Sequence, residues 1–413
     1  MGEELRRIAF FTNTFTPDIN GVSLVISTFR RELQRRGVEV YVFAPAPVGD
    51  DPLKDDPHIL RFPSVRLLSM DYAAAVPFSR HVSRTLRRVA FDLVHTHHPL
   101  WVGQWGAHYA RRSKIPHVTT IHTHYELFAS LVPLPQSLVK MYLRRRVRRH
   151  CNSCQVVTTP APSNKSQLEQ MGLQPLILVV PNPVDVTVFE QACGETVRKR
   201  LGLGGKFVLG YVGRLSPEKQ LPLVVQAGAK VCAECPAAHL LIVGDGPSRP
   251  EVEEQVRGLG LADRCTLVGS VPHDQVPDYQ AALDVFLTAS LAETQPLAYA
   301  EAMAAGTPVV AVTGLGAVDM IEDGVNGFLV SRQDAPKNLA QAVLRLAKDR
   351  SLHDRLSRQA REWARRYSVS EATDRLFEAY KMTLDRFALH PAGTTPVRLL
   401  GRTPGMAKRG PAR

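Results

Sequence analysis

The chain has 413 residues, of which 44% are hydrophobic and 22% are charged, the composition of a soluble globular protein. This length accommodates two domains of ordinary size. No run approaches the roughly 18 consecutive apolar residues that a membrane-spanning helix needs, and the start, MGEELRRIAFF, has no apolar signal core. We therefore expect a cytoplasmic protein without a membrane span.

Positive charge is concentrated in the first half of the chain and in its tail. Residues 1–190 contain 23 Lys/Arg and 15 Asp/Glu, whereas residues 191–388 contain 23 and 24. The last 25 residues add five basic groups and no acidic group. This asymmetry indicates an anionic partner, either nucleic acid or an acidic membrane face.

The first half alternates short apolar segments with helical ones. Strands are predicted at 8–11, 38–43, 93–95, 118–121, 156–159 and 176–180. This alternation predicts a parallel, doubly wound sheet. Gly21 follows the loop after the first strand and opens a helix predicted for 22–36. A glycine there lets the backbone approach a phosphate at the helix N-terminus.

Six cysteines include two CxxC pairs, Cys151/Cys154 and Cys232/Cys235, with 77 residues between them. A zinc ribbon separates such pairs by roughly 15 to 20 residues, and a reducing cytosol disfavours disulfides. We therefore expect buried or half-buried small side chains at these positions rather than a metal or redox site.

Pro181 and Pro183 interrupt the pattern, and a second strand-rich half follows, with strands predicted at 207–211, 240–243, 265–268, 285–287 and 309–312. We predict one Rossmann-like domain at 1–185 and another at 186–368, facing each other across a cleft. A C-terminal helix is predicted for 369–388 and a basic, disordered tail for 389–413.

Polar and glycine residues follow three strands of the second half. Arg214 and Lys219 could converge on a diphosphate, Arg214 through its forked donors and Lys219 as a point charge. Gly213 and the turn Gly244-Asp245-Gly246 permit a close backbone approach. Glu293 lies in a loop before a helix predicted for 298–305, and Glu301 lies within that helix. Taken singly, each charged residue could equally be a solvated surface side chain.

Together these motifs resemble those of the retaining GT-B glycosyltransferases of family 4, over roughly residues 7–388. The motifs are the loop from Phe11 to Gly21, Gly213-Arg214 with Glu218-Lys219, Gly244 to Pro247, and Glu293 with Glu301. The resemblance implies a GT-B fold whose C-terminal helix returns to the first domain. It also implies that the second domain holds most of a nucleotide-sugar donor.

The same resemblance implies the role of each site residue. Arg214 and Lys219 would hold the diphosphate and balance the charge of the leaving group. Glu293 would contact hydroxyls of the transferred sugar, and Glu301 would contact the ribose. The main chain of Thr294, Gln295, Pro296 and Leu297 would line the phosphate pocket, and Gly21 would approach it from the first domain.

His122 falls where the family keeps a histidine beside the transferred sugar, although a lone histidine at a strand end is often structural. The implied reaction retains the anomeric configuration by front-face attack, with the leaving phosphate helping to deprotonate the acceptor. The sequence has no D-x-D pair of the kind that metal-dependent sugar transferases use. We therefore expect neither a metal nor another cofactor.

The acceptor is suggested by a narrower resemblance. The segments His122 to Glu126 and Ser290 to Leu297 look like those of bacterial glucosyltransferases that glycosylate diacylglycerol. A helix at 140–149 is rich in basic residues, beside an apolar stripe at Val139, Leu143 and Val147. Such a helix suits a peripheral protein on an anionic membrane. The basic residues expected to bind the membrane are Lys140, Arg144, Arg145, Arg146, Arg148 and Arg149.

We therefore expect transfer of a hexose, glucose from UDP-glucose, to a lipid such as diacylglycerol at the inner face of the cell membrane. A GDP-mannose-dependent alpha-mannosyltransferase is the first alternative. A non-catalytic module that binds a nucleotide sugar or an anionic polymer is the second. Nucleic acid is not an expected partner, because aromatic residues are only 7% and no recognition motif is present.

Three residues depart from the family pattern. Pro296 stands where the subgroup usually has glycine, so that one amide facing the phosphate would be missing. Pro183 occupies a linker position that is often glycine, and Gln220 follows Lys219 where glycine is common. These departures bear on the shape of the donor pocket more than on the class of reaction.

Overall fold

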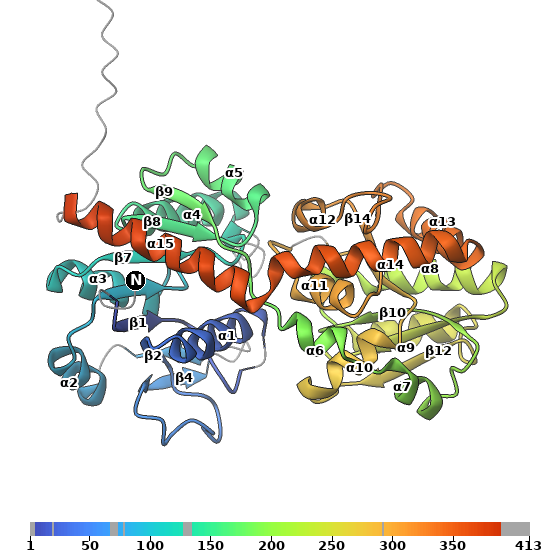
Figure 1. Cartoon of the computed structure of the whole chain (residues 1–413), viewed down its shortest axis with the longest axis horizontal. Helices are drawn as coiled ribbons and strands as arrows, with labels where there is room; N and C mark the ends of the chain where they lie inside the picture. The colour runs from blue at the N-terminus through green and yellow to red at the C-terminus, as the bar shows by residue number, and fades with distance from the viewer. Residues whose placement is uncertain are drawn as a thin grey trace, which may run out of the picture.

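The computed structural model describes residues 5–18, 20–66, 73–76, 79–126, 134–290 and 293–389. Two parallel β-sheets lie side by side, each flanked by helices (Figure 1). We call the seven-stranded sheet with its helices the first domain and the six-stranded sheet with its helices the second domain. Of the basic tail predicted for 389–413, Leu389 instead ends the last helix, and residues 390–413 lie outside the described residues.

The first sheet has the strand order β3-β2-β1-β6-β7-β8-β9, with every neighbouring pair parallel. Chain order reverses between β1 and β6, and in such sheets ligands bind at the crevice beyond that switch point. The strands are β1 (Arg7–Phe11), β2 (Glu39–Pro45), β3 (Ile59–Phe62), β6 (Leu93–Thr96), β7 (His117–Thr120), β8 (Val156–Thr159) and β9 (Leu176–Val179). A two-stranded antiparallel ribbon, β4 (Ser64–Arg66) with β5 (Ala73–Ala75), lies beside it.

Helices of the first domain begin where the loops after the strands end. In α1 (Gly21–Arg35), Asn20 is the N-cap, and its Oδ1 accepts a hydrogen bond from the Ser23 amide at 3.0 Å. Gly21 is therefore the first residue of the helix. The remaining helices are α2 (Arg80–Arg88), α3 (Val102–Ser113), α4 (Gln136–Cys151) and α5 (Pro162–Gln170).

The second sheet has the order β12-β11-β10-β13-β14-β15, again wholly parallel, with a switch point between β10 and β13. Its strands are β10 (Phe207–Val212), β11 (Ala238–Val243), β12 (Cys265–Gly269), β13 (Val285–Thr288), β14 (Val309–Val312) and β15 (Gly327–Val330). β10, β11, β13 and β14 are almost completely buried, as near-continuous apolar runs in a central parallel sheet should be.

The helices of the second domain include α11 (Leu297–Ala304), which packs against α14 (Arg350–Ala364). The contact is tight where Arg361 donates to the Ala305 carbonyl at 3.1 Å. The other helices are α6 (Val186–Glu190), α7 (Gly194–Arg200), α8 (Leu221–Glu234), α9 (Arg249–Gly258), α10 (Val276–Ala281), α12 (Leu315–Met320) and α13 (Ala335–Lys348). Short 3₁₀ turns are η2 (Pro217–Lys219), η3 (His273–Gln275) and η4 (Arg365–Tyr367).

The chain crosses between the domains twice, and the two crossings touch. The Val184 amide donates to the Tyr367 carbonyl at 2.7 Å, and Val184 forms an isolated bridge with Ser368. The last helix, α15 (Val369–Leu389), then lies across the first domain (Figure 1), where Tyr380 is completely buried. The predicted pair of Rossmann-like domains and the returning C-terminal helix are therefore confirmed. Among the described residues, no helix is both long and apolar enough to cross a bilayer.

Candidate active site

The loops that follow β10, β11 and β13 meet at one edge of the second sheet. Because all three strands are parallel neighbours, their carboxyl ends lie together. β10 leads into Gly213 and Arg214, β11 into Gly244, and β13 into the loop that contains Glu293. The prediction that these groups share one edge rested on their positions after strands of a sheet expected to be parallel.

The glycines of this edge allow one loop to pack on another. Gly213, Gly244 and Gly246 have φ angles of 154°, 132° and 154°. A Cβ on Gly244 would lie 1.9 Å from the Gly213 carbonyl oxygen, and one on Gly246 would lie 2.3 Å from that of Leu215. The close approach is therefore made by backbone to backbone within the protein. Asp245 beside them accepts from Arg249 at 3.0 Å and from the Gly246 amide at 2.7 Å.

Lys219 and Glu293 form the central pair of the site. Lys219 Nζ donates to Glu293 Oε1 in an ion pair, and the side chains are only 22% and 18% exposed. The Ser290 hydroxyl donates to the same carboxylate oxygen at 2.9 Å. In the structure Lys219 therefore pairs with a carboxylate, whereas the sequence predicted that Lys219 and Arg214 converge on a diphosphate. Arg214 is exposed at the end of β10, and its carbonyl accepts from the Tyr211 hydroxyl at 3.1 Å.

The helix α11 starts one residue after Pro296, which is its N-cap. Thr294, Gln295 and Pro296 are all buried in the turn that precedes the helix. Amides of the first turn of a helix have no partner within the helix and attract anions. Pro296 supplies no amide, so the first two donors of α11 are the amides of Leu297 and Ala298.

Glu301 lies in the second turn of α11 and is 9% exposed. Among the described residues, no hydrogen bond or ion pair to its carboxylate is seen. Burial disfavours the carboxylate and raises the pKa of Glu301 from 4.5 to about 7. An unpaired buried carboxyl of this kind is a candidate for contact with a ligand.

The first domain contacts the start of α11 at two points. A Cβ on Gly21 would lie 3.9 Å from Leu297 Cδ1, and the Leu297 side chain packs against the apolar core of the first domain. The Asn182 amide donates to Gln295 Oε1 at 2.7 Å, and Asn182 Nδ2 donates to the Gln295 carbonyl at 3.2 Å. The N-termini of α1 and α11 therefore approach each other across the interdomain junction.

His122 follows β7 and is buried. Its Nε2 lies 3.2 Å from His97 Nδ1, and the two rings are stacked. Burial lowers the pKa of His122 to about 4, with the nearby Asn182 side chain acting in the opposite direction. Nδ1 of His122 and Nε2 of Gln295 are both buried without a hydrogen-bond partner in the described part of the chain. Buried polar atoms are normally paired, so these two are available for a ligand.

Sequence reasoning missed two residues that support this site. His97 contacts His122, and Asn182 joins the linker to Gln295. A signal for His97 was present, because the histidine-rich segment His95-Thr-His97-His98 spans the end of β6, and His122-Thr-His124 follows β7. No comparable signal marked Asn182, whose role depends on how the domains pack.

The surface of α4 combines charge with exposed apolar side chains. Lys140, Arg144, Arg145, Arg148 and Arg149 are exposed, whereas Arg146 is half-buried and donates to Gln104. Arg144 also pairs with Glu126 at 2.7 Å. Val139 and Val147 of the predicted apolar stripe face the core. Four large apolar residues, which the sequence analysis did not single out, are 57–62% exposed at and before the first half of the helix: Leu134, Leu138, Met141 and Tyr142.

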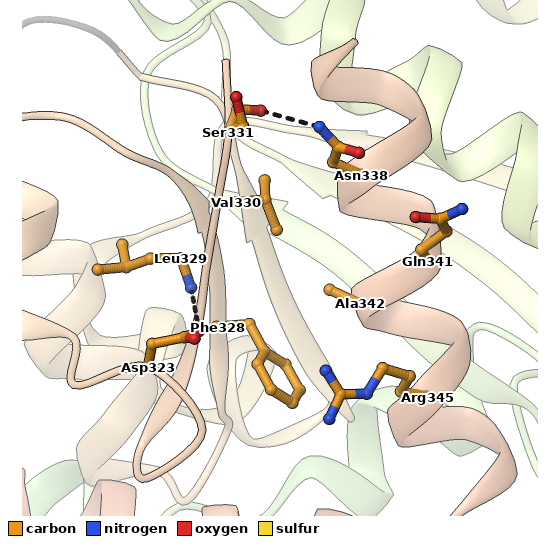
Figure 2. A pocket seen from close by; sticks show the side chains of 9 residues that line it. All are labelled: Asp323, Phe328, Leu329, Val330, Ser331, Asn338, Gln341, Ala342 and Arg345. Carbon is orange, nitrogen blue, oxygen red and sulfur yellow. Dashed lines mark hydrogen bonds between the residues drawn. The ribbon is translucent and has the colours of Figure 1, made fainter. Parts of the chain in front are cut away.

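A groove of about 350 Å³ lies elsewhere, between β15 and α13. Figure 2 shows the Arg345 guanidinium beside the Phe328 ring, at 4.5 Å from its centroid, and Asp323 accepting from the Leu329 amide at 2.9 Å. No predicted site residue lines this groove. Its chemistry therefore does not bear on the site described above.

Comparison with known proteins agrees with this architecture. Residues 19–188 match the model named Glycosyltransferase Family 4, and residues 195–363 match Glycosyl transferases group 1. The chain is 26% identical to an alpha-monoglucosyldiacylglycerol synthase of Acholeplasma laidlawii, over 79% of this chain and 85% of that protein. It is 29% identical to a GDP-mannose-dependent alpha-mannosyltransferase of Mycobacterium tuberculosis, over 86% and 93%.

Two further comparisons define the family and the fold. A 2-deoxystreptamine glucosyltransferase of Streptomyces kanamyceticus is 32% identical over 73% of this chain and 80% of that protein. The crystal structure of Anabaena Alr3699/HepE in complex with UDP has a TM-score of 0.74 at 22% identity, covering 91% of this chain and 99% of that one. The chain therefore belongs to glycosyltransferase family 4, the group 1 glycosyltransferases with a GT-B fold, and resembles the bacterial enzymes that glucosylate diacylglycerol.

Proposed function

We propose that this glycosyltransferase transfers glucose from UDP-glucose to a lipid such as diacylglycerol, with retention of the anomeric configuration. The main observation in support is the ion pair of Lys219 with Glu293, placed beside the start of α11 and at the switch point of the second sheet. Similarity to the alpha-monoglucosyldiacylglycerol synthase of Acholeplasma laidlawii supports the donor sugar and the acceptor.

In this proposal the diphosphate binds between the two facing helix N-termini. The amides of Leu297 and Ala298 point towards it from α11, and Gly21 approaches from α1. Each helix terminus presents partial positive charge. Lys219 and Arg214 add two full charges, so that the donor is neutralised by the protein's own groups. Gly213, Gly244 and Gly246 shape the wall of the pocket, with Asp245 held by Arg249.

The sugar and the ribose are assigned to the two glutamates. Glu293 would accept hydrogen bonds from sugar hydroxyls once Lys219 turns towards the diphosphate, because the ion pair would exchange one anionic partner for another. Glu301, eight residues further along the chain and in the second turn of α11, would accept from the ribose hydroxyls. Thr294, Gln295 and Pro296 would form the turn between them. His122, held neutral by burial, would hydrogen-bond a sugar hydroxyl through Nδ1.

The chemical step follows from this placement. The bond from the anomeric carbon to the diphosphate oxygen breaks, and a bond to the acceptor hydroxyl oxygen forms on the same face. The acceptor proton passes to the departing phosphate oxygen. Negative charge grows on the diphosphate, where Lys219, Arg214 and the α11 amides stabilise it. This scheme requires no metal ion, and activity should therefore persist in EDTA.

The acceptor lipid would reach the site from a membrane bound to α4. Leu138, Met141 and Tyr142 provide exposed apolar contacts, and Arg145 and Arg148 provide charge for anionic head groups. A surface that combines both interactions binds membranes without spanning them. We place the protein on the cytoplasmic face of the cell membrane.

A mannosyltransferase that uses GDP-mannose is the second candidate, because the relative from Mycobacterium tuberculosis is a GDP-mannose-dependent alpha-mannosyltransferase. Both candidates use the same diphosphate site and differ at the base and at the sugar. A non-catalytic module is disfavoured, because Lys219, Glu293 and Glu301 are present together at the switch point.

The decisive experiment offers the protein a panel of UDP-sugars and GDP-sugars, with vesicles that contain or lack diacylglycerol. We expect UDP release from UDP-glucose only when diacylglycerol is present, and a glucosylated lipid with the α configuration. GDP release from GDP-mannose would favour the alternative. Turnover of no donor, with nucleotide affinity unchanged in Glu301→Ala, would contradict an enzymatic role.

A further inference from the structure

Three side chains with metal-binding atoms meet in the interior of the first domain. His117 opens β7, His150 lies in the last turn of α4, and Cys154 follows that helix. All three are buried, and their candidate ligand atoms lie within 4.8 Å of one another. The CxxC spacing alone predicted no metal site here.

The separations are close to those of a tetrahedral zinc site. Zinc bonds of about 2.0–2.1 Å to nitrogen and about 2.3 Å to sulfur place tetrahedral neighbours about 3.3 to 3.6 Å apart. His117 Nε2 lies 3.8 Å from Cys154 Sγ. The Thr96 hydroxyl oxygen lies 3.0 Å from Nε2 of both His117 and His150. Two imidazole nitrogens and a sulfur thus lie within 4.8 Å of one another, with the Thr96 hydroxyl in contact with both nitrogens and the Thr119 hydroxyl 3.1 Å from that of His150.

The surrounding fold presents these groups on one face of the sheet. Thr96 and Thr119 are neighbours in register on β6 and β7, and their hydroxyls lie 2.8 Å apart. Side chains alternate along a strand, so His95, next to Thr96, points to the opposite face. Cys151, the other cysteine of the pair, packs instead in an apolar cluster with Val147 and Leu168.

We propose that His117, His150 and Cys154 form a structural Zn²⁺ site, with the Thr96 hydroxyl as the fourth neighbour. Cys154 would bind as a thiolate and release its proton to solvent. The two imidazoles would present the Nε2 lone pair and carry their proton on Nδ1. The metal would fasten the C-terminal turn of α4 to β6 and β7. It is distinct from the reaction centre, whose proposed chemistry uses no metal.

The competing explanation is a hydrogen-bonded core without metal. In that arrangement the Thr96 hydroxyl donates to Thr119 and accepts from Nε2 of both histidines, which satisfies the hydroxyl completely. Cys154 then donates to the His150 carbonyl at 3.4 Å. The two explanations differ in whether the full chain retains one metal ion with thiolate ligation.

The test uses the untagged full chain, reduced and stripped with a chelator, then titrated with Co²⁺ and with Zn²⁺. Bound metal per chain is measured after gel filtration, thiolate ligation is measured by the charge-transfer absorption of Co²⁺, and stability is measured by thermal unfolding. Cys154→Ser is compared with Cys151→Ser, which changes a buried cysteine of the same segment that does not face the cluster.

We expect the wild type and Cys151→Ser to retain one metal per chain, to show the thiolate band and to unfold at higher temperature with Zn²⁺. Cys154→Ser should lose the band and most of the bound metal. A wild type that binds no stoichiometric metal, or a band that survives in Cys154→Ser, would overturn the proposal in favour of the hydrogen-bonded core. If Cys154→Ser does not fold, the stoichiometry and the band of the wild type decide the question.

Discussion

Nδ1 of His95 lies 2.9 Å from the phenol oxygen of Tyr380, although 285 positions separate the two residues. Tyr380 belongs to α15, the helix that returns from the second domain. The His95 ring lies 4.0 Å from the His97 ring, and His97 contacts His122 at 3.2 Å. A continuous line of buried contacts therefore joins the returning helix to the candidate active site.

We predict that Tyr380→Phe lowers kcat with little change in the KM for the donor. The variant keeps the ring but removes a buried hydrogen bond, which costs about 1 kcal/mol of stability. The His95 imidazole is then held through Nε2 alone, which lies 2.7 Å from the Thr120 hydroxyl. His97 and His122 would then be held less firmly, so the variant tests a positioning role. Steady-state kinetics at saturating lipid measures the effect.

The control for this variant is Thr383→Val on the same helix. Thr383 is buried and donates only to the Ala379 carbonyl within α15, at 2.7 Å. Thr383→Val should lower thermal stability by about as much as Tyr380→Phe, without changing kcat. Equal losses of kcat in the two variants would mean that α15 acts through stability alone.

Lys219→Ala should reduce kcat/KM by about 10²- to 10³-fold, the usual loss when one group that stabilises developing negative charge is removed. Glu293→Gln should also reduce turnover, because the sugar would lose a charged acceptor. Residues in one ion pair interact, so the double variant should lose less than the product of the single effects. Lys230→Ala on α8, which removes an exposed lysine of the same domain, is the control. If the losses of kcat/KM in Lys219→Ala and Glu293→Gln simply multiplied in the double variant, a shared site would be contradicted.

Part of this structure could be predicted from the sequence, because the central strands are short runs dominated by apolar and β-branched residues and alternate with longer helical segments. The edge strands β3 and β15 were missed. β3 contains Arg61, which faces Asp51 at 2.8 Å, and β15 begins with a glycine. A charged residue and a glycine each weaken the apolar pattern by which a strand is predicted, and an edge strand, which has a neighbour on only one side, tolerates both.

Contacts between distant segments could not be predicted in this way. The pairing of Lys219 with Glu293 and the approach of His117 to Cys154 depend on how loops pack in three dimensions. Pro296 shows the same limit. The sequence indicates that it removes an amide, but only the structure shows that it is the N-cap, so that the amides of Leu297 and Ala298 follow it in the first turn of α11.

For the membrane surface, we predict that replacing Leu138 and Met141 with serine reduces sedimentation with anionic vesicles. At high salt this double serine variant should lose more vesicle binding than the double variant Arg145→Gln with Arg148→Gln. The reason is that salt screens charge and leaves apolar contacts unaffected. Arg87→Gln with Arg88→Gln on α2 removes two exposed charges from the same domain and is the matched control. Equal loss in the α2 and α4 arginine variants would show that only the overall charge matters.

The raised pKa of Glu301 predicts the direction of two pH effects. The folded protein retains a proton up to about pH 7, whereas the unfolded chain releases it near 4.5. The contribution of Glu301 to the free energy of unfolding is therefore complete below pH 4.5 and declines by up to about 3 kcal/mol as the pH rises through 7. Glu301→Gln cannot ionise, so its stability relative to the wild type should rise over the same interval.

Donor binding should have the opposite pH dependence, because the ribose hydroxyls would donate to the ionised carboxylate. If only the ionised form binds, the affinity for UDP should increase about tenfold between about pH 6 and about pH 8. Burial keeps the pKa of His122 near 4, so His122 does not titrate in this interval. Calorimetric titration of the wild type and Glu301→Gln with UDP measures the slope. A slope that persists unchanged in Glu301→Gln would assign it to another group and remove Glu301 from the ribose site.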